Sequence, residues 1–434
     1  MKILLINQNS VLNLGDFAIY LETLRLLEAA FPGAEITLSF HDTASAQRAL
    51  PSYPIIPSLD AWAFQVDAAG TIIFTPTLRR LLDVCALALA ALCYRAGWRV
   101  PPPFRDAAKR QLVEAFAAAD LVLACGGGYI YETQPPRGLL AQLVSLLPWT
   151  IFLLGGHLLA LALGKPLVLL PQSIGPFQER IYRAIATWIV RRAKLTLVRE
   201  RESLALLERL GASANACYAP DLAFGMPSAP ASAARELLAE AGLDPSSPGR
   251  RIGMTLLDWA AQSRAFAEQH DYERAIVGCI DALTAAGDWV VLFAQCHSAY
   301  EAWDDHQVNL RVRAQARQPE RIVLFSPIVR PELLQAMYGQ MDAFVGTRMH
   351  SVILATNAGV PALAISYLHK SQGIMRELGL AERCFDIRSV TAKQLVDGLA
   401  RLRAEPALAQ GQAYVQRSQR IKRALQALLP MLAR

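Results

Sequence analysis

Several chemical motifs are missing from this 434-residue sequence, and each absence excludes a class of function. It contains no D-x-D and no cluster of His, Cys and carboxylate residues with metal-ligand spacing, so we expect no metal site. Neither G-x-G-x-x-G nor GK[ST] is present, so the common signals for nucleotide phosphates are lacking. No run of cations with interleaved aromatic residues occurs either, and we expect no nucleic-acid partner.

Cysteine, lysine and charge in general are scarce. The seven cysteines are scattered and never spaced as C-x-x-C, which argues against a disulfide framework and favours a reduced, cytoplasmic protein. Only 18% of the residues are charged, 53% are hydrophobic and the net charge is +6, so the chain can bury a large core and is not disordered. Only seven of the 43 cationic residues are lysine, so a lysine near a candidate site is a more informative sign of function than an arginine.

Two apolar segments raise the question of membrane contact. Residues 138–164 contain no charged side chain and are long enough to span a bilayer, but Pro148 and Gly155–Gly156 interrupt them. We expect one buried helix or two short ones there, and peripheral contact with the inner face of the membrane stays open. Residues 81–94 are shorter and contain Asp83, so a core or interfacial helix is expected. The N-terminal apolar run is too short for a signal peptide and predicts a strand.

Short apolar runs alternate with amphipathic stretches along the chain, which is typical of parallel sheets built from βαβ units. The first half predicts strands at residues 2–6, 35–40, 71–74, 121–124, 166–170, 195–198 and 217–219. The pattern restarts at residues 251–256, 289–294, 322–325, 343–345 and 361–366. The predicted fold class is α/β, with two Rossmann-like, doubly wound domains in tandem.

Proline, serine and glycine replace the apolar pattern near residues 227–233 and 245–249, which marks a linker. The division that follows is a first domain at 1–225, a linker at 226–250, a second domain at 251–395 and C-terminal helices at 396–434. Whether those helices cross back to the first domain stays open, and the sequence does not indicate an oligomeric state.

Ligands of such sheets bind beyond the carboxyl ends of the strands, so the loops there hold the candidate site residues. Asn13 and Asp16 follow the first strand and would face hydroxyl groups of a ligand, unless Asp16 is only a helix cap. Gly127 and Gly128 follow a later strand, where backbone amides can approach an anion or a sugar closely. A simple tight turn is the alternative there.

Three more candidates follow other strands. Gln172 can donate and accept hydrogen bonds, although its loop could be only a turn. Arg199 is the first residue past its strand and is expected to point into the cleft, with a surface salt bridge as the alternative. His297 also lies at a strand end and is expected to contribute to substrate binding.

The strongest candidates are Arg348 and His350, on a loop between a strand and a helix. A helix N-terminus favours an anion, and Arg348 can bind a carboxylate or phosphate with two hydrogen bonds. His350 is a histidine, the side-chain type that most often acts as an acid or base at physiological pH. Lys370 follows the next strand, where it could contact the same anion. We expect Arg348 and His350 to be catalytic and Lys370 to bind substrate.

In their order along the chain, these motifs resemble those of the polysaccharide pyruvyl transferase family. The resemblance extends from residue 1 to near residue 380, and the remaining C-terminal residues add nothing to it. The matching segments are Asn13–Asp16, Gly126–Gly128, Gln172–Pro176, Val198–Arg199 with Ser203, Tyr218–Asp221, Gly346–His350 and Ser366 with Lys370.

The resemblance implies two domains facing across a cleft, as in glycosyltransferases of the B architecture, with the acceptor on the first domain and the donor on the second. It implies transfer of pyruvate from phosphoenolpyruvate, as co-substrate and with no cofactor, to a sugar or glycan acceptor as a ketal. Whether the acceptor is lipid-linked stays open. If the residue roles of the family apply at the matching positions, Arg348 and Arg199 bind the donor, His350 is the acid/base and Lys370 supports the anionic donor.

Two other functions stay open. The same fold could serve a glycosyltransferase that uses a nucleotide-sugar donor. A non-catalytic partner in polysaccharide assembly is the second alternative, although the presence of Arg348, His350 and Lys370 disfavours it. The acceptor sugar and its hydroxyl positions cannot be read from the sequence.

Overall fold

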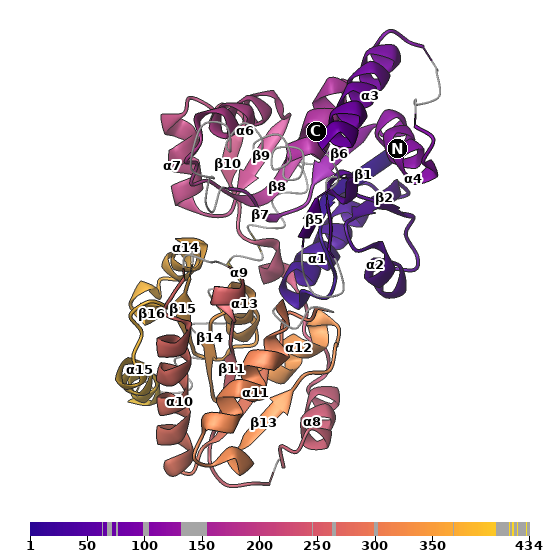
Figure 1. Cartoon of the computed structure of the whole chain (residues 1–434). Helices are drawn as coiled ribbons and strands as arrows, with labels where there is room; N and C mark the ends of the chain where they lie inside the picture. Colours follow the sequence, from indigo (N-terminus) through magenta and orange to yellow (C-terminus); the bar gives the residue numbers. More distant parts are fainter. Residues whose placement is uncertain are drawn as a thin grey trace. The chain divides into compact units, whose positions relative to one another are not determined.

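The chain forms two compact units, seen here in a computed structural model (Figure 1). Unit 1 comprises Met1–Val11, Ile19–Leu222 and Gln426–Arg434, and unit 2 comprises Leu12–Ala18 and Ala223–Leu425. The structure describes residues 1–62, 64–66, 72–74, 77–98, 104–131, 154–244, 246–262, 266–298, 303–367 and 369–404, with residues 416, 419, 420, 423 and 431. Each unit contains its own parallel sheet, so the predicted α/β class with two Rossmann-like domains is confirmed.

Unit 1 is built on a parallel sheet in the strand order β10-β9-β8-β6-β1-β2-β3, with β7 paired to β8. The strand predicted at residues 71–74 is β5, which pairs antiparallel with β4 outside the main sheet. The elements are β1 (Lys2–Gln8), α1 (Leu14–Ala30), β2 (Glu35–Phe40), α2 (Thr43–Ala49), β3 (Ile55–Pro57), β4 (Phe64–Val66), β5 (Ile72–Phe74), α3 (Thr77–Arg95), α4 (Ala107–Ala118), β6 (Leu121–Ala124), β7 (Gly127–Ile130), β8 (Leu167–Ile174), α6 (Arg180–Arg192), β9 (Leu195–Val198), α7 (Arg201–Arg209) and β10 (Ala216–Tyr218).

Unit 2 has a parallel sheet in the order β13-β12-β11-β14-β15-β16. Its first strand is central and the order reverses beside it, as in doubly wound folds. The elements are α8 (Ala231–Glu240), β11 (Arg251–Thr255), α9 (Trp259–Gln262), α10 (Gln269–Ala285), β12 (Trp289–Phe293), α11 (Asp305–Gln315), β13 (Ile322–Phe325), α12 (Pro331–Tyr338), β14 (Ala343–Gly346), α13 (Met349–Asn357), β15 (Ala362–Ser366), α14 (His369–Glu377), β16 (Cys384–Asp386) and α15 (Ala392–Ala404).

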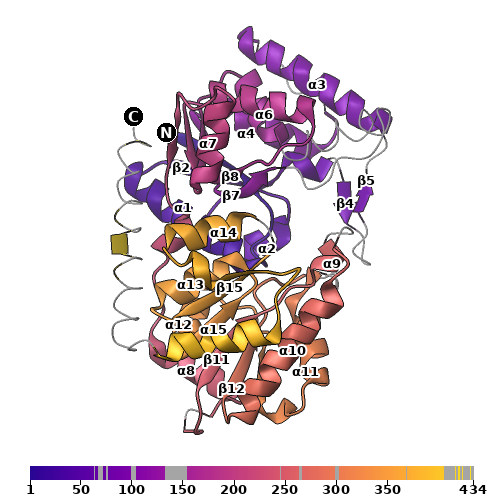
Figure 2. The same ribbon diagram turned by 90° about the vertical axis from the view of Figure 1, so that its left-hand side faces the viewer.

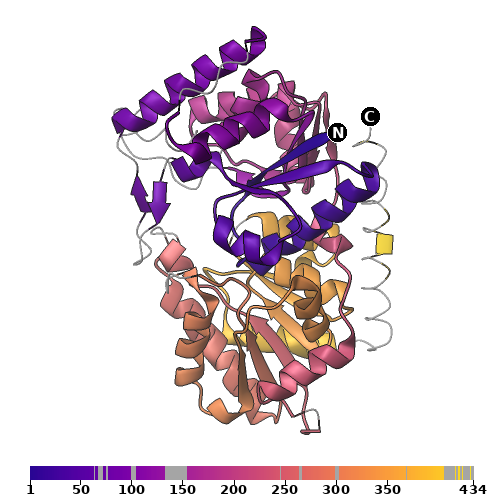
Figure 3. The same cartoon turned by 90° about the vertical axis from the view of Figure 1, so that its right-hand side faces the viewer.

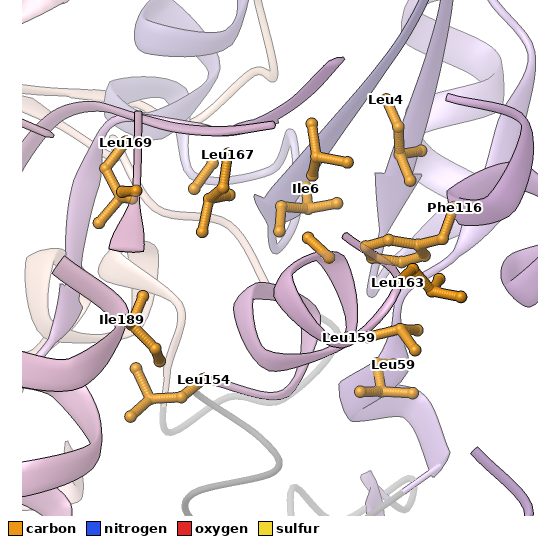
Figure 4. Packing of buried hydrophobic residues seen from close by; sticks show 14 of the residues in the cluster. Leu4, Ile6, Leu59, Phe116, Leu154, Leu159, Leu163, Leu167, Leu169 and Ile189 are labelled. Atoms are coloured by element: carbon orange, nitrogen blue, oxygen red, sulfur yellow. The ribbon is translucent and has the colours of Figure 1, made fainter. Parts of the chain in front are cut away.

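Part of the long apolar segment is a core helix of unit 1. Residues 154–162 are helical, and Leu154, Leu159 and Leu163 point into a cluster with side chains of β1, α4 and α6 (Figure 4). Gly156 allows this close packing, because a Cβ there would lie 3.0 Å from Ile6 Cδ1. The expectation of a buried helix holds for this part, whereas residues 132–153 lie outside the described residues. In the ranges that the structure describes, no helix has the length and apolarity that crossing a membrane requires.

The predicted linker at 226–250 is wrong in its central part, which is helix α8 of unit 2. Ala234 and Leu238 lie four residues apart on α8, and both are buried. They belong to the face that packs against α12, and the Ala229 N–H also donates to the Glu332 carbonyl. The prolines and serines around α8 are helix-flanking turns, so composition indicated a linker where tertiary packing forms a helix.

The helices of unit 2 cover both faces of its sheet. Side chains of α10, α11 and α15 form one buried cluster with β11 and β12 (Figure 2). The opposite face packs on α12, where the rings of Phe293, Tyr338 and Phe344 contact one another. The helix predicted after residue 396 belongs, as far as Ala404, to α15 in unit 2. The possible return of the later residues to the first domain, which the sequence left open, falls outside the described residues.

We predict that Leu154→Ala lowers the free energy of unfolding of unit 1 by about 2–5 kcal/mol, because a buried leucine is removed and a cavity remains. Urea titration measures the change. Leu89→Ala on α3 is the matched control, since Leu89 is 55% exposed and its loss should change the value by less than about 0.5 kcal/mol. Equal effects of the two substitutions would show that residues 154–162 are not a core helix.

Candidate functional site

The candidate site of unit 2 lies at the carboxyl edge of its sheet. Thr255 at the end of β11 is paired with Phe293 of β12 and with Gly346 of β14, so the residues that follow these parallel strands meet at one edge. Arg348 and His350 lie here, at the start of α13. This edge is next to the point where the strand order reverses, the usual ligand position in α/β sheets.

Hydroxyl groups hold the loop between β14 and α13. Thr347 Oγ1 lies 2.8 Å from the hydroxyl oxygen of Tyr272. Ser351 Oγ donates to the carbonyl of Arg348 at 2.6 Å and lies 2.6 Å from Thr255 Oγ1. Because three different elements supply these partners, the loop has one defined conformation, which the sequence did not reveal.

A buried ion pair orients the Arg348 guanidinium. Its Nε donates to Asp305 Oδ2 at 3.2 Å and its Nη2 to Asp305 Oδ1 at 2.5 Å. Arg348 is 8% exposed and Asp305 only 1%. Burial acts to lower the pKa of Arg348, but Asp305 raises it, so the guanidinium stays charged. Asp305 does not use the two N–H groups of Nη1 or the second N–H group of Nη2. The edge of the guanidinium formed by Nη1 and Nη2 can therefore still bind two oxygens of an anion.

Asp305 is itself fixed by the end of β12. Its Oδ2 accepts hydrogen bonds from the backbone N–H groups of Gln295 at 3.2 Å and Cys296 at 2.8 Å. Burial raises the pKa of Cys296 to about 12, so the thiol is protonated at neutral pH and is no nucleophile. The sequence placed an aspartate pair close after His297, but only the folded chain pairs Asp305 with Arg348.

His350 packs against the first turn of α1, which is grouped with unit 2. A Cβ added to Gly15 would lie 2.5 Å from Nδ1 and 2.6 Å from Cβ of His350, so only glycine leaves room for the imidazole. Two hydrogen bonds hold this segment, from the Leu14 N–H to the Gln295 carbonyl and from the His297 N–H to the Leu12 carbonyl, both at 3.0 Å. Motifs from the two ends of the sequence thus meet in one unit.

The Asn13 side chain, and not that of Asp16, caps α1. Asn13 Oδ1 accepts the Gly15 N–H at 3.2 Å, while Asn13 Nδ2 donates to Asp16 Oδ2 at 2.9 Å. The alternative in which Asp16 is the helix cap is therefore wrong. Both side chains are half-buried in the segment that contacts His350, and their expected contact with a ligand stays a prediction.

His297 offers an imidazole nitrogen next to the same segment. Burial lowers the pKa of His297, although Asp304 and Asp305 act in the opposite direction, so the ring is uncharged at neutral pH. The ring also hydrogen-bonds the backbone of Ala294. Among the residues that the structure describes, Nε2 has no hydrogen-bond partner. His297 thus has a buried ring nitrogen with unsatisfied hydrogen-bonding capacity, and its expected contribution to substrate binding stays a prediction.

Gly127, Gly128 and Gln172 lie in unit 1, where the expected glycine loop is strand β7. Gly127 pairs with Gln172 of β8. The glycines here allow strands to approach, since a Cβ on the preceding Gly126 would lie 2.8 Å from the Pro171 carbonyl oxygen. Gln172 is buried and its Nε2 donates to the Cys125 carbonyl at 3.1 Å. The expected turn is therefore a strand with a packing role, and the expected contact of these residues with a ligand stays a prediction.

Arg199 is buried, with 1% of its surface exposed, so both the open cleft position and the surface salt bridge are wrong. Its Nη1 donates to Asp221 Oδ2 at 2.7 Å, and its Nε to Ser173 Oγ at 2.8 Å and Glu200 Oε1 at 3.2 Å. Ser203 Oγ also donates to Glu200, at 3.1 Å. These motif residues form one network that joins the ends of β8, β9 and β10.

The candidate residues therefore fall into two groups. Unit 2 brings together Asn13, Asp16, His297, Arg348 and His350, whereas Gly127, Gly128, Gln172 and Arg199 belong to unit 1. Lys370 is the second residue of α14; its side chain is outside the description, so its contact with a donor stays a prediction. Over the described part of the chain, no group of three or more His, Cys, Asp or Glu side chains is placed to hold a metal ion.

We predict that Gly15→Ala destabilises the protein by about 1–3 kcal/mol, because the added methyl group overlaps the His350 imidazole. The double variant Gly15→Ala/His350→Ala should recover most of that loss, since the smaller side chain makes room. Thermal unfolding of the wild type, both single variants and the double variant measures the coupling. Additive effects would show that Gly15 and His350 do not touch.

Known proteins resemble this chain in sequence and in fold. A sequence model of the polysaccharide pyruvyl transferase family matches residues 13–369. The amylovoran biosynthesis protein AmsJ of Erwinia amylovora is 26% identical over 285 residues, and the match covers 65% of this chain and 65% of that relative.

Two solved structures are similar in fold alone, given their low identity. The UDP-GlcNAc 2-epimerase of Neisseria meningitidis, bound to UDP-GlcNAc, has a TM-score of 0.56 at 10% identity, over 100% of this chain and 99% of that one. S. aureus MnaA, in a co-structure with UDP, has a TM-score of 0.52 at 12% identity, over 99% and 97%. Because the family model spans most of the sequence, this chain belongs to the polysaccharide pyruvyl transferase family.

Proposed function

We propose that this chain transfers the pyruvyl unit of phosphoenolpyruvate to a sugar of a polysaccharide or its precursor, forming a ketal. The observation that supports the proposal is the assembly at one sheet edge of Arg348, fixed by Asp305, and His350, packed on Gly15. A fixed cation and an acid/base group are the two functions that this chemistry needs. Membership of the family and similarity to AmsJ support a role in polysaccharide modification.

The donor is a small molecule with two anionic groups, a carboxylate and a phosphate. The edge of Arg348 that Asp305 leaves available can pair with two oxygens of either group. The N-terminus of α13, which begins at the next residue, adds its dipole. Lys370 is proposed to contact the donor as well. Arg199, bound within its buried network, is proposed to hold the loops of unit 1 and not to touch the donor.

The reaction adds a proton to the methylene carbon of the donor and joins C2 to two sugar oxygens. The bond from C2 to the phosphate oxygen breaks through an oxocarbenium-like state, and phosphate leaves. Of the two hydroxyl protons lost by the sugar, one balances the proton added to carbon and the other leaves on phosphate. His350 is the proposed proton carrier, and the Arg348 guanidinium stabilises the leaving phosphate.

The acceptor is proposed to be a glycan or a lipid-linked sugar precursor. Phosphoenolpyruvate is a cytoplasmic metabolite in this scheme, and the seven cysteines are all free thiols, as a reducing compartment favours. We therefore place the reaction in the cytoplasm.

The deciding experiment is phosphate release from phosphoenolpyruvate with a panel of sugar acceptors, with mass spectrometry of the product. We expect release that depends on the acceptor, and a product heavier by one pyruvate ketal. Thermal unfolding with added ligands separates the alternatives: phosphoenolpyruvate should raise the Tm and nucleotide-sugars should not. The reverse would favour a nucleotide-sugar glycosyltransferase, and no response to either ligand would favour a non-catalytic partner.

The two site residues should differ in their kinetic effects. His350→Ala should lower kcat by about 10²- to 10⁴-fold, the usual contribution of a general acid or base. Arg348→Lys keeps a charge but loses the planar pair of donors, so it should raise the KM for phosphoenolpyruvate by about tenfold or more. Initial-rate kinetics measures both changes.

Matched controls come from α10. His270→Ala and Arg274→Lys alter exposed side chains of the same types, and both should leave kcat and KM at wild-type values. If His350→Ala turned over at the wild-type rate, His350 would not be the proton carrier. If Arg348→Lys had an unchanged KM for phosphoenolpyruvate, Arg348 would not bind the donor.

A further inference from the structure

Helix α3 of unit 1 has two apolar faces, and among the residues that the structure describes one face is packed and the other is exposed. On the inner face Ala90 and Ala91 are buried in the core cluster, with Leu87 half-buried against it. Asp83 lies on this side too and forms an ion pair with Lys109. The helix is thus anchored to the unit through one side, and the ribbon views show α3 along the outer edge of unit 1 (Figure 2, Figure 3).

The outer face carries an exposed apolar stripe. Leu82, Leu89 and Leu92 are 61%, 55% and 66% exposed, and Cys85 between them is exposed as well. Their spacing of three, four and three residues places all four within about one quarter of the helix circumference at 3.6 residues per turn. A soluble surface rarely presents large apolar side chains in such a row.

A tryptophan extends the stripe beyond the end of the helix. Gly97 has a φ of +76°, in the left-handed region, and the Trp98 N–H donates to the Cys93 carbonyl at 2.9 Å. This is the cap geometry that ends many helices. It fixes the position of Trp98, which is 64% exposed. Tryptophan, like tyrosine, is enriched at membrane–water interfaces.

The charges around the stripe are positive. Arg79 and Arg95 are exposed, one near each end of α3, and helical geometry places them on opposite sides of the stripe. The single carboxylate of the helix, Asp83, is turned inward to Lys109. An apolar face between cations is the pattern of helices that lie in the surface of an anionic bilayer.

We infer that α3 and Trp98 form a membrane-docking surface that lies on a bilayer of anionic lipid, with the four apolar side chains among the acyl chains and both arginines at the headgroups. A second copy of the chain fits less well. The one carboxylate of α3, Asp83, is paired with Lys109, so pairing two α3 stripes would supply no acidic partner for the arginines of either copy. The inference does not depend on the proposed pyruvyl transfer, although a lipid-linked acceptor would be presented at such a surface.

Vesicle sedimentation of the full chain tests this surface. The wild type should sediment with phosphatidylcholine vesicles that contain phosphatidylglycerol, less in high salt, and little with phosphatidylcholine alone. Leu89→Glu/Leu92→Glu should lower the partition coefficient at least about tenfold, because two charges enter the apolar face. The matched control, Leu310→Glu/Ile328→Glu, adds the same charge at exposed apolar positions of unit 2 and should bind more strongly than the α3 variant.

Folding and activity are followed in the same variants. Both double variants alter exposed side chains, so their Tm should stay near that of the wild type. Their phosphate release with a water-soluble acceptor should equal that of the wild type. Equal sedimentation of the α3 variant and the control would overturn the inference, as would equal binding of the wild type to both kinds of vesicle. A wild-type dimer that the α3 substitutions dissociate would assign the stripe to self-association instead.

Discussion

The carboxylate of Asp305 is the constraint on which the candidate site of unit 2 depends. It accepts backbone N–H groups at the end of β12 and pairs with Arg348 after β14, so one buried side chain connects two strand ends. Removing one partner of a buried ion pair costs about 3–5 kcal/mol, because the other charge is left uncompensated. The direction of the Arg348 guanidinium, and with it the available edge for an anion, follows from this pair.

The N-terminal segment Leu12–Ala18 is the second structural requirement of the site. It belongs to unit 2 although the chain on either side belongs to unit 1, and backbone hydrogen bonds attach it to residues that follow β12. Its glycine gives the His350 imidazole the space that any other residue would occupy. The boundary drawn at residue 225 placed this segment in the wrong unit, because sequence order does not show where a short loop is bound.

The errors in the sequence-based description have one physical origin. Gly127, Gln172 and Arg199 were expected in open loops because they follow strands, but each has partners from other strands and is buried. The region of α8 was read as a linker because of its prolines and serines, although Ala234 and Leu238 give it an apolar side that α12 covers. A local pattern specifies a strand end or a turn, but burial depends on segments that are distant in sequence.

The sequence by itself determined the α/β class, most strand positions and the Arg348–His350 loop, because hydrophobic periodicity and the residues at strand ends are local properties. It also determined the family, through the order of short motifs over the chain. Tertiary structure alone decided that Gly15 contacts His350, that Asp305 orients Arg348 and that Arg199 is buried with Asp221. It also decided which face of α3 stays exposed. These are relations between distant segments, and their energies come from packing and ion pairing that exist only when the chain is folded.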